Sequence, residues 1–147
     1  MGWLLIIAII YYAATQPAAG VFSMTDGIPF SALAEAIQTE EGYYPGSRAY
    51  RNNNPGNLRY AGQYGAIGQD GAGFAIFPDY QTGFNALVAQ LRLDATRNPQ
   101  WTLYDFISHY APASDGNDPF SYVDNVVASL TGAGYSASTN TTLGSFS

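Results

Sequence analysis

The sequence predicts an α+β fold, mainly helical, with one small β element between the first and second helices of a single domain. Two observations predict this fold. Four segments between residues 29 and 132 carry apolar side chains at helical spacing next to capping residues. Between the first two of them, a glycine-rich segment ends in a short apolar run that suits a small hairpin. The length of 147 residues is enough for one domain with a hydrophobic core.

Composition argues against several kinds of site. The chain has no cysteine, so neither a disulfide framework nor a thiolate metal site is possible. It has one histidine, His109, so a cluster of histidine ligands is not expected either. The formal net charge is −6, which repels polyanions and argues against nucleic-acid binding. We therefore expect no metal, no organic cofactor and no nucleic-acid partner.

The chain begins with an apolar segment. It is apolar from Trp3 to Ala14, and no charged side chain precedes Asp26. This run is shorter than the roughly 20 residues of a membrane span, and its length is closer to that of a signal-peptide core. If the segment is extended to Phe22, it becomes long enough to span a membrane. We expect residues 1–25 to be a signal or signal-anchor with a spacer, and residues 3–22 to contact a membrane. A buried core helix is the alternative.

Residues 29–42, PFSALAEAIQTEEG, predict the first helix of the domain. Ser31 can cap its beginning, and Gly42 suits the position after its end. Its apolar side consists of Leu33, Ala36 and Ile37. Residues 43–63 predict a loop, because they are rich in asparagine, proline and glycine.

The next two elements are a hairpin and the clearest helix. Residues 64–78, YGAIGQDGAGFAIFP, predict the small hairpin. Residues 79–98 predict a helix with Asp79 as its cap. The apolar stripe of this helix consists of Phe84, Leu87, Val88 and Leu91.

Two further helices follow. Residues 102–112 predict a helix in which Thr102 and Asp105 form a capping box. Residues 117–132 predict another, capped by Asp118 with a proline at its first position. Its inward positions are Val123, Val126, Val127 and Leu130. The predicted domain therefore covers residues 26–132. The remaining residues, 133–147, are rich in serine, threonine and glycine, and we expect them to form a flexible tail.

Glu40 and Glu41 are adjacent at the end of the first predicted helix. A carboxyl group there faces the negative end of the helix dipole, and a neighbouring carboxylate and partial burial also disfavour ionisation. All three effects raise a glutamate's pKa, as a general acid near neutral pH requires. Helical spacing allows either residue to continue the apolar side. A solvated helix end or an ion pair with a nearby arginine is the structural alternative.

Four segments occur in an order that resembles one family. They are EGYYPGSRAYRNNNPGNLRYAGQ (41–63), GFAIFPDYQTGFNAL (73–87), TLYDFISHYAP (102–112) and NDPFSYVDNVV (117–127). Together they resemble the small lysozyme-like muralytic proteins of bacteriophage virions and bacterial genomes, which belong with the lytic transglycosylases and goose-type lysozymes. The resemblance covers roughly residues 28–132.

The resemblance implies a lysozyme-like fold with a cleft between two lobes, and cleavage of the β-1,4 bond between MurNAc and GlcNAc in peptidoglycan. Glu41, directly before the glycine and the aromatic pair, matches the catalytic acid/base of the family, and Tyr122 matches a cleft tyrosine near that acid. Asp70 and Asp79 are the nearest candidates for a second acid, but neither belongs to a matching motif. One acid without a partner favours a lytic transglycosylase over a lysozyme-type hydrolase.

A glycan groove needs aromatic faces for sugar rings and polar groups for N-acetyl substituents. The loop and the hairpin supply asparagine, glutamine, tyrosine and phenylalanine side chains of this kind, although asparagine also forms turns. The residues expected to contact substrate are Asn54, Asn57, Tyr60, Gln63, Phe77 and Tyr122. The expected partners are peptidoglycan glycan strands, and the expected location is exported, membrane-anchored facing the cell wall, or within a phage virion.

Two other classes of function remain open, a non-catalytic protein and a membrane-anchored interaction module, and a third is disfavoured. A non-catalytic peptidoglycan-binding or virion structural protein would keep the fold and the groove without depending on Glu41. A serine hydrolase with His109 as its base is disfavoured, because no G-x-S-x-G motif is present.

Overall fold

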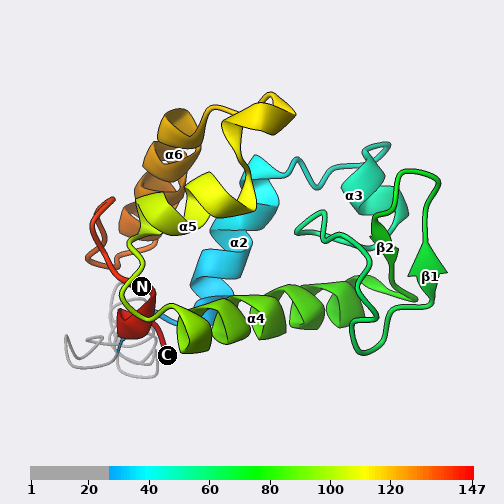
Figure 1. The fold of residues 1–147 in the computed structure, drawn as a ribbon, viewed down its shortest axis with the longest axis horizontal. Helices are drawn as coiled ribbons and strands as arrows, with labels where there is room; N and C mark the ends of the chain where they lie inside the picture. Colours follow the sequence, from blue (N-terminus) through cyan, green and yellow to red (C-terminus); the bar gives the residue numbers. More distant parts are fainter. Residues whose placement is uncertain (1–26) are drawn as a thin grey trace, which may run out of the picture.

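The computed structural model describes residues 27–147. The helices are α2 (Phe30–Glu40), α3 (Arg48–Arg51), α4 (Tyr80–Arg97), α5 (Leu103–Tyr110) and α6 (Pro119–Gly132). The strands are β1 (Gly68–Gln69) and β2 (Ala75–Ile76), and two short 3-10 helices are η1 (Ala113–Asp115) and η2 (Leu143–Ser145). The predicted class, a mainly helical α+β fold with a small β element between its first and second long helices, is confirmed (Figure 1).

The apolar segment over residues 3–22 lies outside the described residues, so its predicted role stays a prediction. Within residues 27–147, the search for a helix of sufficient length and hydropathy to cross a bilayer found none.

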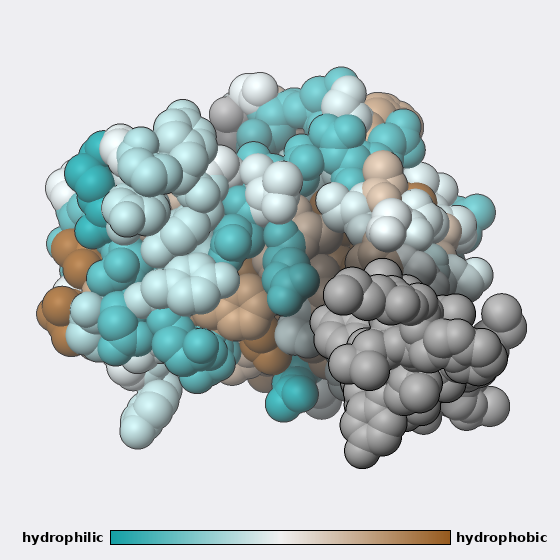
Figure 2. Space-filling model, turned by 180° about the vertical axis from the view of Figure 1, so that it is seen from behind, coloured by the Kyte–Doolittle hydropathy of each residue, from teal (hydrophilic) through white to brown (hydrophobic). Residues whose placement is uncertain are grey.

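The long helix α4 runs along one side of the whole domain (Figure 1). At one end of it stand α2, α5 and α6, and at the other end lie α3 and the two strands. Helix α2 packs against both α4 and α6, and α5 packs against α6. Opposite the view of Figure 1 the surface is largely hydrophilic, with apolar residues at its edge and in a recess near its middle (Figure 2).

The core forms where the apolar sides of the helices meet. The side chains of Leu33 and Ile37 on α2 are fully buried, as are Leu87 and Leu91 on α4. The inward positions predicted for the last helix agree with the structure, because Val123, Val126 and Leu130 are buried and Val127 is partly buried against the core. Helical periodicity therefore identified the core side of α2, α4 and α6.

Three of the predicted helix caps are confirmed. The Asp79 carboxylate accepts a hydrogen bond from the backbone N–H of Thr82 at 2.8 Å. Thr102 and Asp105 form the reciprocal capping box of α5. The Asp118 carboxylate accepts from the backbone N–H of Phe120, with proline at the first position of α6.

The predicted cap at Ser31 is wrong. Helix α2 begins at Phe30 after Pro29, whose backbone is extended, and no side chain caps it. The backbone N–H of Phe30 instead donates to the carbonyl of Ser147 at 2.9 Å, so a distant segment satisfies this end of the helix.

The expected loop over residues 43–63 contains a short helix that the sequence analysis missed. Helix α3 begins after Ser47, whose hydroxyl accepts a hydrogen bond from the backbone N–H of Tyr50 at 3.1 Å. A serine followed by a single helical turn gives too little periodicity to be recognised.

The prediction of a flexible tail over residues 133–147 is also wrong. Leu143 is fully buried, and the ring of Phe146 lies 5.7 Å from that of Phe30. Backbone hydrogen bonds of 2.8 Å join Leu143 to Trp101 and Leu103 to Thr141. Two apolar anchors and these hydrogen bonds hold a segment whose composition alone indicates disorder.

The loop before the hairpin is fixed by Asn54, whose side chain is fully buried. Its amide donates to the carbonyls of Leu58 and Ala75, each at 2.9 Å, and accepts from the N–H of Leu58. The loop also approaches α4 closely, because a Cβ atom at Gly83 would lie 1.8 Å from the carbonyl oxygen of Asn53. Only glycine permits this contact at that position of α4.

We expect Leu143→Ala to lower the free energy of unfolding by about 2–5 kcal/mol, since it leaves a cavity under the C-terminal segment. Leu93→Ala is the matched control, because Leu93 is 41% exposed and its truncation leaves no buried cavity. Urea unfolding of both variants measures the difference. Equal, small losses would mean that residues 133–147 contribute little to the domain.

Candidate active site

Glu41 lies at the C-terminal end of α2. It is the C-cap residue, and its backbone N–H donates to the carbonyl of Ile37. Gly42 follows with a positive φ of 69°, which ends the helix as predicted. The turn leaves the Glu41 side chain half-buried at the wall of a groove.

Two side chains from other segments hold the Glu41 carboxylate. Its Oε1 accepts a hydrogen bond from the hydroxyl of Tyr122 on α6 at 3.0 Å. Its Oε2 accepts from the Asn57 amide at 3.0 Å, and the same amide also donates to the Glu41 backbone carbonyl at 3.3 Å. Asn57 adopts a φ of 45°, in the left-handed region that asparagine tolerates better than most residues. The carboxylate is thus fixed from both sides.

Burial is the main influence on the Glu41 carboxyl, and it raises the pKa of that group. The hydrogen bonds from Asn57 and Tyr122 and the positive charge of Arg48 lower the pKa, but together they only partly offset burial. The neighbouring charge of Glu40 adds a small increase in the pKa. The pKa of Glu41 is thus shifted in the direction expected from the sequence, with burial rather than the adjacent carboxylate as the principal cause.

The tyrosines near Glu41 stay protonated. Burial and the charge of Glu41 raise the pKa of Tyr122, and burial raises that of Tyr110 well above its ordinary value. Tyr122 is therefore a permanent donor to the carboxylate. Tyr110 instead donates its hydroxyl to the carbonyl of Gly56, which ties α5 to the loop that carries Asn57.

Glu40 has a different environment from its neighbour. Its Oε2 accepts a hydrogen bond from the Asn125 amide on α6 at 3.1 Å, in an exposed position. It is not among the residues that line the groove. The structure therefore distinguishes two glutamates that helical spacing did not.

The groove at Glu41 has a volume of about 850 Å³. Its walls come from the end of α2, the loop after α3, the hairpin, α4 and α5. Besides Glu41 and Asn57, the lining includes Arg48, Arg59, Gln63, Phe74, Gln90, Asp94, His109, Tyr110 and Asn117. Amide, carboxylate, guanidinium and aromatic groups thus face one continuous space.

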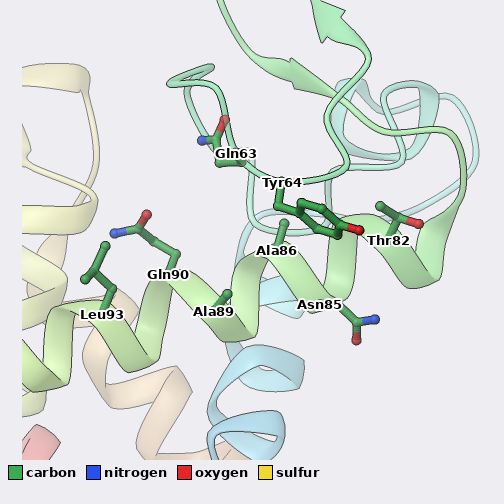
Figure 3. Close-up of a pocket in the computed structure, with 8 residues that line it drawn as sticks. All are labelled: Gln63, Tyr64, Thr82, Asn85, Ala86, Ala89, Gln90 and Leu93. Atoms are coloured by element: carbon green, nitrogen blue, oxygen red, sulfur yellow. The ribbon is translucent and has the colours of Figure 1, made fainter.

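A smaller pocket of about 350 Å³ adjoins the groove (Figure 3). It shares Gln63 and Gln90 with the groove and lies along α4. The ring of Tyr64 lies above Ala86 in Figure 3, and this side chain is 97% exposed. Its ring face is therefore free for a ligand.

The substrate-contacting residues expected from the sequence fall into four groups. Asn57 and Gln63 line the groove, while Tyr122 is 8% exposed and contacts the Glu41 carboxylate rather than open space. Tyr60 is 42% exposed but lies outside the groove lining. For Asn54 and Phe77 the expectation is wrong, because both are buried in the core. In a loop-rich segment, asparagine and phenylalanine side chains pack in the interior of the protein as readily as they contact a ligand.

Asp70 and Asp79, the candidates for a second acid, have structural roles. Asp70 accepts hydrogen bonds from the Asn52 amide and from the N–H groups of Ala72 and Phe74, and Asp79 caps α4. These hydrogen bonds lower the pKa of both carboxyls. Neither residue lines the groove.

Sequence analysis missed Asp94, which does line the groove. Both of its carboxylate oxygens accept from the Gln90 amide at 3.0 Å. The spacing of Gln90 and Asp94, four residues apart on a helix, puts them on one face. That spacing was the available signal, but polar residues on a long helix are usually solvated.

We expect Tyr122→Phe to raise the pKa of Glu41 further, because it removes a hydrogen bond that favours the ionised carboxylate. Titration of the Glu41 carboxyl carbon by NMR measures the shift. Tyr104→Phe is the control, since Tyr104 packs on Phe120 and makes no contact with Glu41. A fall in the Glu41 pKa of the Tyr122→Phe variant would contradict the assigned contact.

Residues 27–147 bring together no group of three histidine, aspartate or glutamate side chains that could hold a metal ion. The chemistry that this groove offers centres on the half-buried Glu41 carboxyl between two fixed donors, with the Asp94 carboxylate in the same lining. Comparisons of the chain with protein-family models, curated proteins and solved structures gave no match.

Proposed function

We propose that this protein cleaves the β-1,4 bond between MurNAc and GlcNAc of peptidoglycan as a lytic transglycosylase. Glu41 acts as the general acid and then as the general base. The observation that carries the proposal is the Glu41 carboxyl itself, which has a raised pKa and two fixed donors at the wall of a groove. A raised pKa favours the protonated carboxyl, which is the form that can donate a proton to a glycosidic oxygen.

In the first step, Glu41 donates its proton to the glycosidic oxygen, and the bond between that oxygen and C1 of MurNAc breaks. The GlcNAc hydroxyl leaves and positive charge develops at C1. In the second step, the 6-hydroxyl oxygen of the same MurNAc bonds to C1, and the Glu41 carboxylate takes the hydroxyl proton. The product is a 1,6-anhydro sugar, no water is consumed, and Glu41 ends protonated as it began.

The two neighbours of Glu41 suit both of its protonation states. Tyr122 and Asn57 donate to the carboxylate that the first step creates, which stabilises it. The Asn57 carbonyl oxygen is buried and accepts no hydrogen bond from residues 27–147. When the side-chain amide of Asn57 rotates by half a turn, this oxygen can accept a hydrogen bond from the O–H of protonated Glu41.

Glu41 must be protonated to act as the acid. The rate of cleavage is therefore expected to fall as pH rises through the raised pKa of Glu41.

The groove also suits a polysaccharide. Sugar rings pack on aromatic faces, and N-acetyl groups pair with amides. The exposed Tyr64 offers such a face, and Gln63, Gln90 and Asn117 offer amides. A lysozyme-like fold belongs to the same proposal: α2 packs in the helical part of the domain, and Glu41 at its end faces a groove that the loop and the hairpin also line. Residues 3–22 would direct the protein to the membrane or through it, or the protein would be a phage virion component.

A lysozyme-type hydrolase of the same bond is the second candidate. Asp94 favours it, since this carboxylate lines the same groove as Glu41. Hydrolysis needs a second carboxylate to activate water or to stabilise the charge at C1. Asp94 therefore replaces Asp70 and Asp79 as the residue on which the hydrolase alternative depends.

We expect Glu41→Gln to lower the rate of peptidoglycan cleavage by about 10²–10⁴, because the isosteric amide cannot donate the proton. Glu40→Gln is the matched control and should retain most of the activity, because Glu40 bonds to Asn125 outside the groove. Dye release from labelled peptidoglycan measures both rates. Equal, small effects in both variants would show that neither glutamate is catalytic, whereas absence of cleavage by the wild type would favour a binding protein.

We expect the products to carry 1,6-anhydromuramic ends, which are lighter than reducing ends by one water. Mass spectrometry of digested peptidoglycan separates the two. If only reducing ends appear, the enzyme is a hydrolase. Asp94→Asn should then abolish its activity, whereas Asp79→Asn should not.

A further inference from the structure

One aromatic ring in the groove wall lies between two positive charges. The guanidinium carbon of Arg48 is 4.0 Å from the ring centroid of Phe74, and that of Arg59 is 4.2 Å from the same centroid. Arg48 comes from α3, while Phe74 precedes β2. All three side chains line the groove that contains Glu41. We call them the Arg48–Phe74–Arg59 stack.

This concentration of positive charge is unusual for the chain. The formal net charge is −6, and lysine and arginine together number 5. Two of these few cations share one ring beside the groove. Each guanidinium carries a full positive charge, which the quadrupole of a phenyl ring offsets only partly. The stack is therefore left with a charge that an anion would neutralise.

Among residues 27–147, the carboxylates that the Arg48 charge reaches are those of Asp70 and Glu41, and both are held by other donors. Arg59 donates to the carbonyl of Ala72 at 2.8 Å, which fixes its position and leaves other N–H groups free. The charge of Arg48 lowers the pKa of Asp70, but the Asp70 carboxylate oxygens accept from an amide and two backbone N–H groups instead. Glu41 is held by Asn57 and Tyr122.

We propose that the Arg48–Phe74–Arg59 stack is a subsite for an oxyanion attached to the glycan strand, and specifically for a carboxylate of its peptide stem. The inference rests on the proposed function. Guanidinium groups match the planar geometry of carboxylates and bind them through paired hydrogen bonds. The protein would then prefer strands that still carry stems to strands from which the stems have been removed. Phosphate groups on wall glycans offer similar chemistry, so the test must separate them.

Three strand preparations make this separation: stem-bearing strands, stem-bearing strands freed of phosphate, and strands denuded of stems by an amidase. We expect the wild type to have a higher kcat/KM on both stem-bearing preparations than on denuded strands. In Arg48→Gln/Arg59→Gln this ratio should fall about five- to tenfold, towards one. Any effect of Arg48 on the Glu41 pKa applies to every preparation, so it cancels in the ratio.

Arg92→Gln/Arg97→Gln is the matched control, because it removes the same charge from α4 outside the groove lining. It should retain the wild-type ratio. Added salt should weaken the wild-type preference more than that of the Arg48→Gln/Arg59→Gln variant, because salt screens exposed charges.

Binding tests the subsite independently of catalysis. In the Glu41→Gln background, the Kd for stem-bearing strands should rise about five- to tenfold when Arg48 and Arg59 are replaced by glutamine, with no comparable rise for denuded strands. Absence of cleavage together with this binding difference would overturn the proposed function alone. Cleavage with an unchanged ratio in the double variant would overturn the subsite alone. Loss of the preference after phosphate removal would overturn the assignment to peptide stems.

Discussion

The structure depends on one constraint. The ionisable carboxyl of Glu41 is held half-buried at the end of α2, a helix whose inner side is buried. The inner side of α2 is fully packed, so its last turn carries Glu41 into the wall of the domain. Burial of that group is unfavourable unless donors surround it. The donors come from the loop after α3 and from α6, so the Glu41 carboxylate joins three parts of the chain. The groove is arranged around this junction.

The features that could be predicted from the sequence are those that depend on interactions between residues close together in the chain. Apolar spacing located α2, α4, α5 and α6, and the side chains of Asp79, Thr102 and Asp118 marked helix starts because each bonds within one turn. The end of α2 before Gly42 was predictable for the same reason. The place of Glu40 and Glu41 at the helix end therefore followed from their own helix, whereas the family resemblance supplied the choice of Glu41. The resemblance also supplied Tyr122, which α6 brings from far along the chain.

Features that depend on distant contacts could not be predicted in this way. The amide of Asn54 and the ring of Phe77 are chemically able to bind a sugar, and only tertiary packing puts them in the core. Asp94 was overlooked because its place at the groove depends on how the loop folds over α4. The segment that contains Leu143 has a polar composition, and a single buried leucine is too weak a pattern to indicate packing.

The pairing of the two ends of the described chain has a consequence for the order of folding. Ile28 forms a parallel bridge with Phe146, and the first N–H of α2 bonds to Ser147. In the chain, these residues follow all of the described helices, so they leave the ribosome after those helices. Contacts between such distant positions also close a large loop, which slows folding. The helix that carries Glu41 at one end is thus completed at its other end by residues that are made after the other described helices.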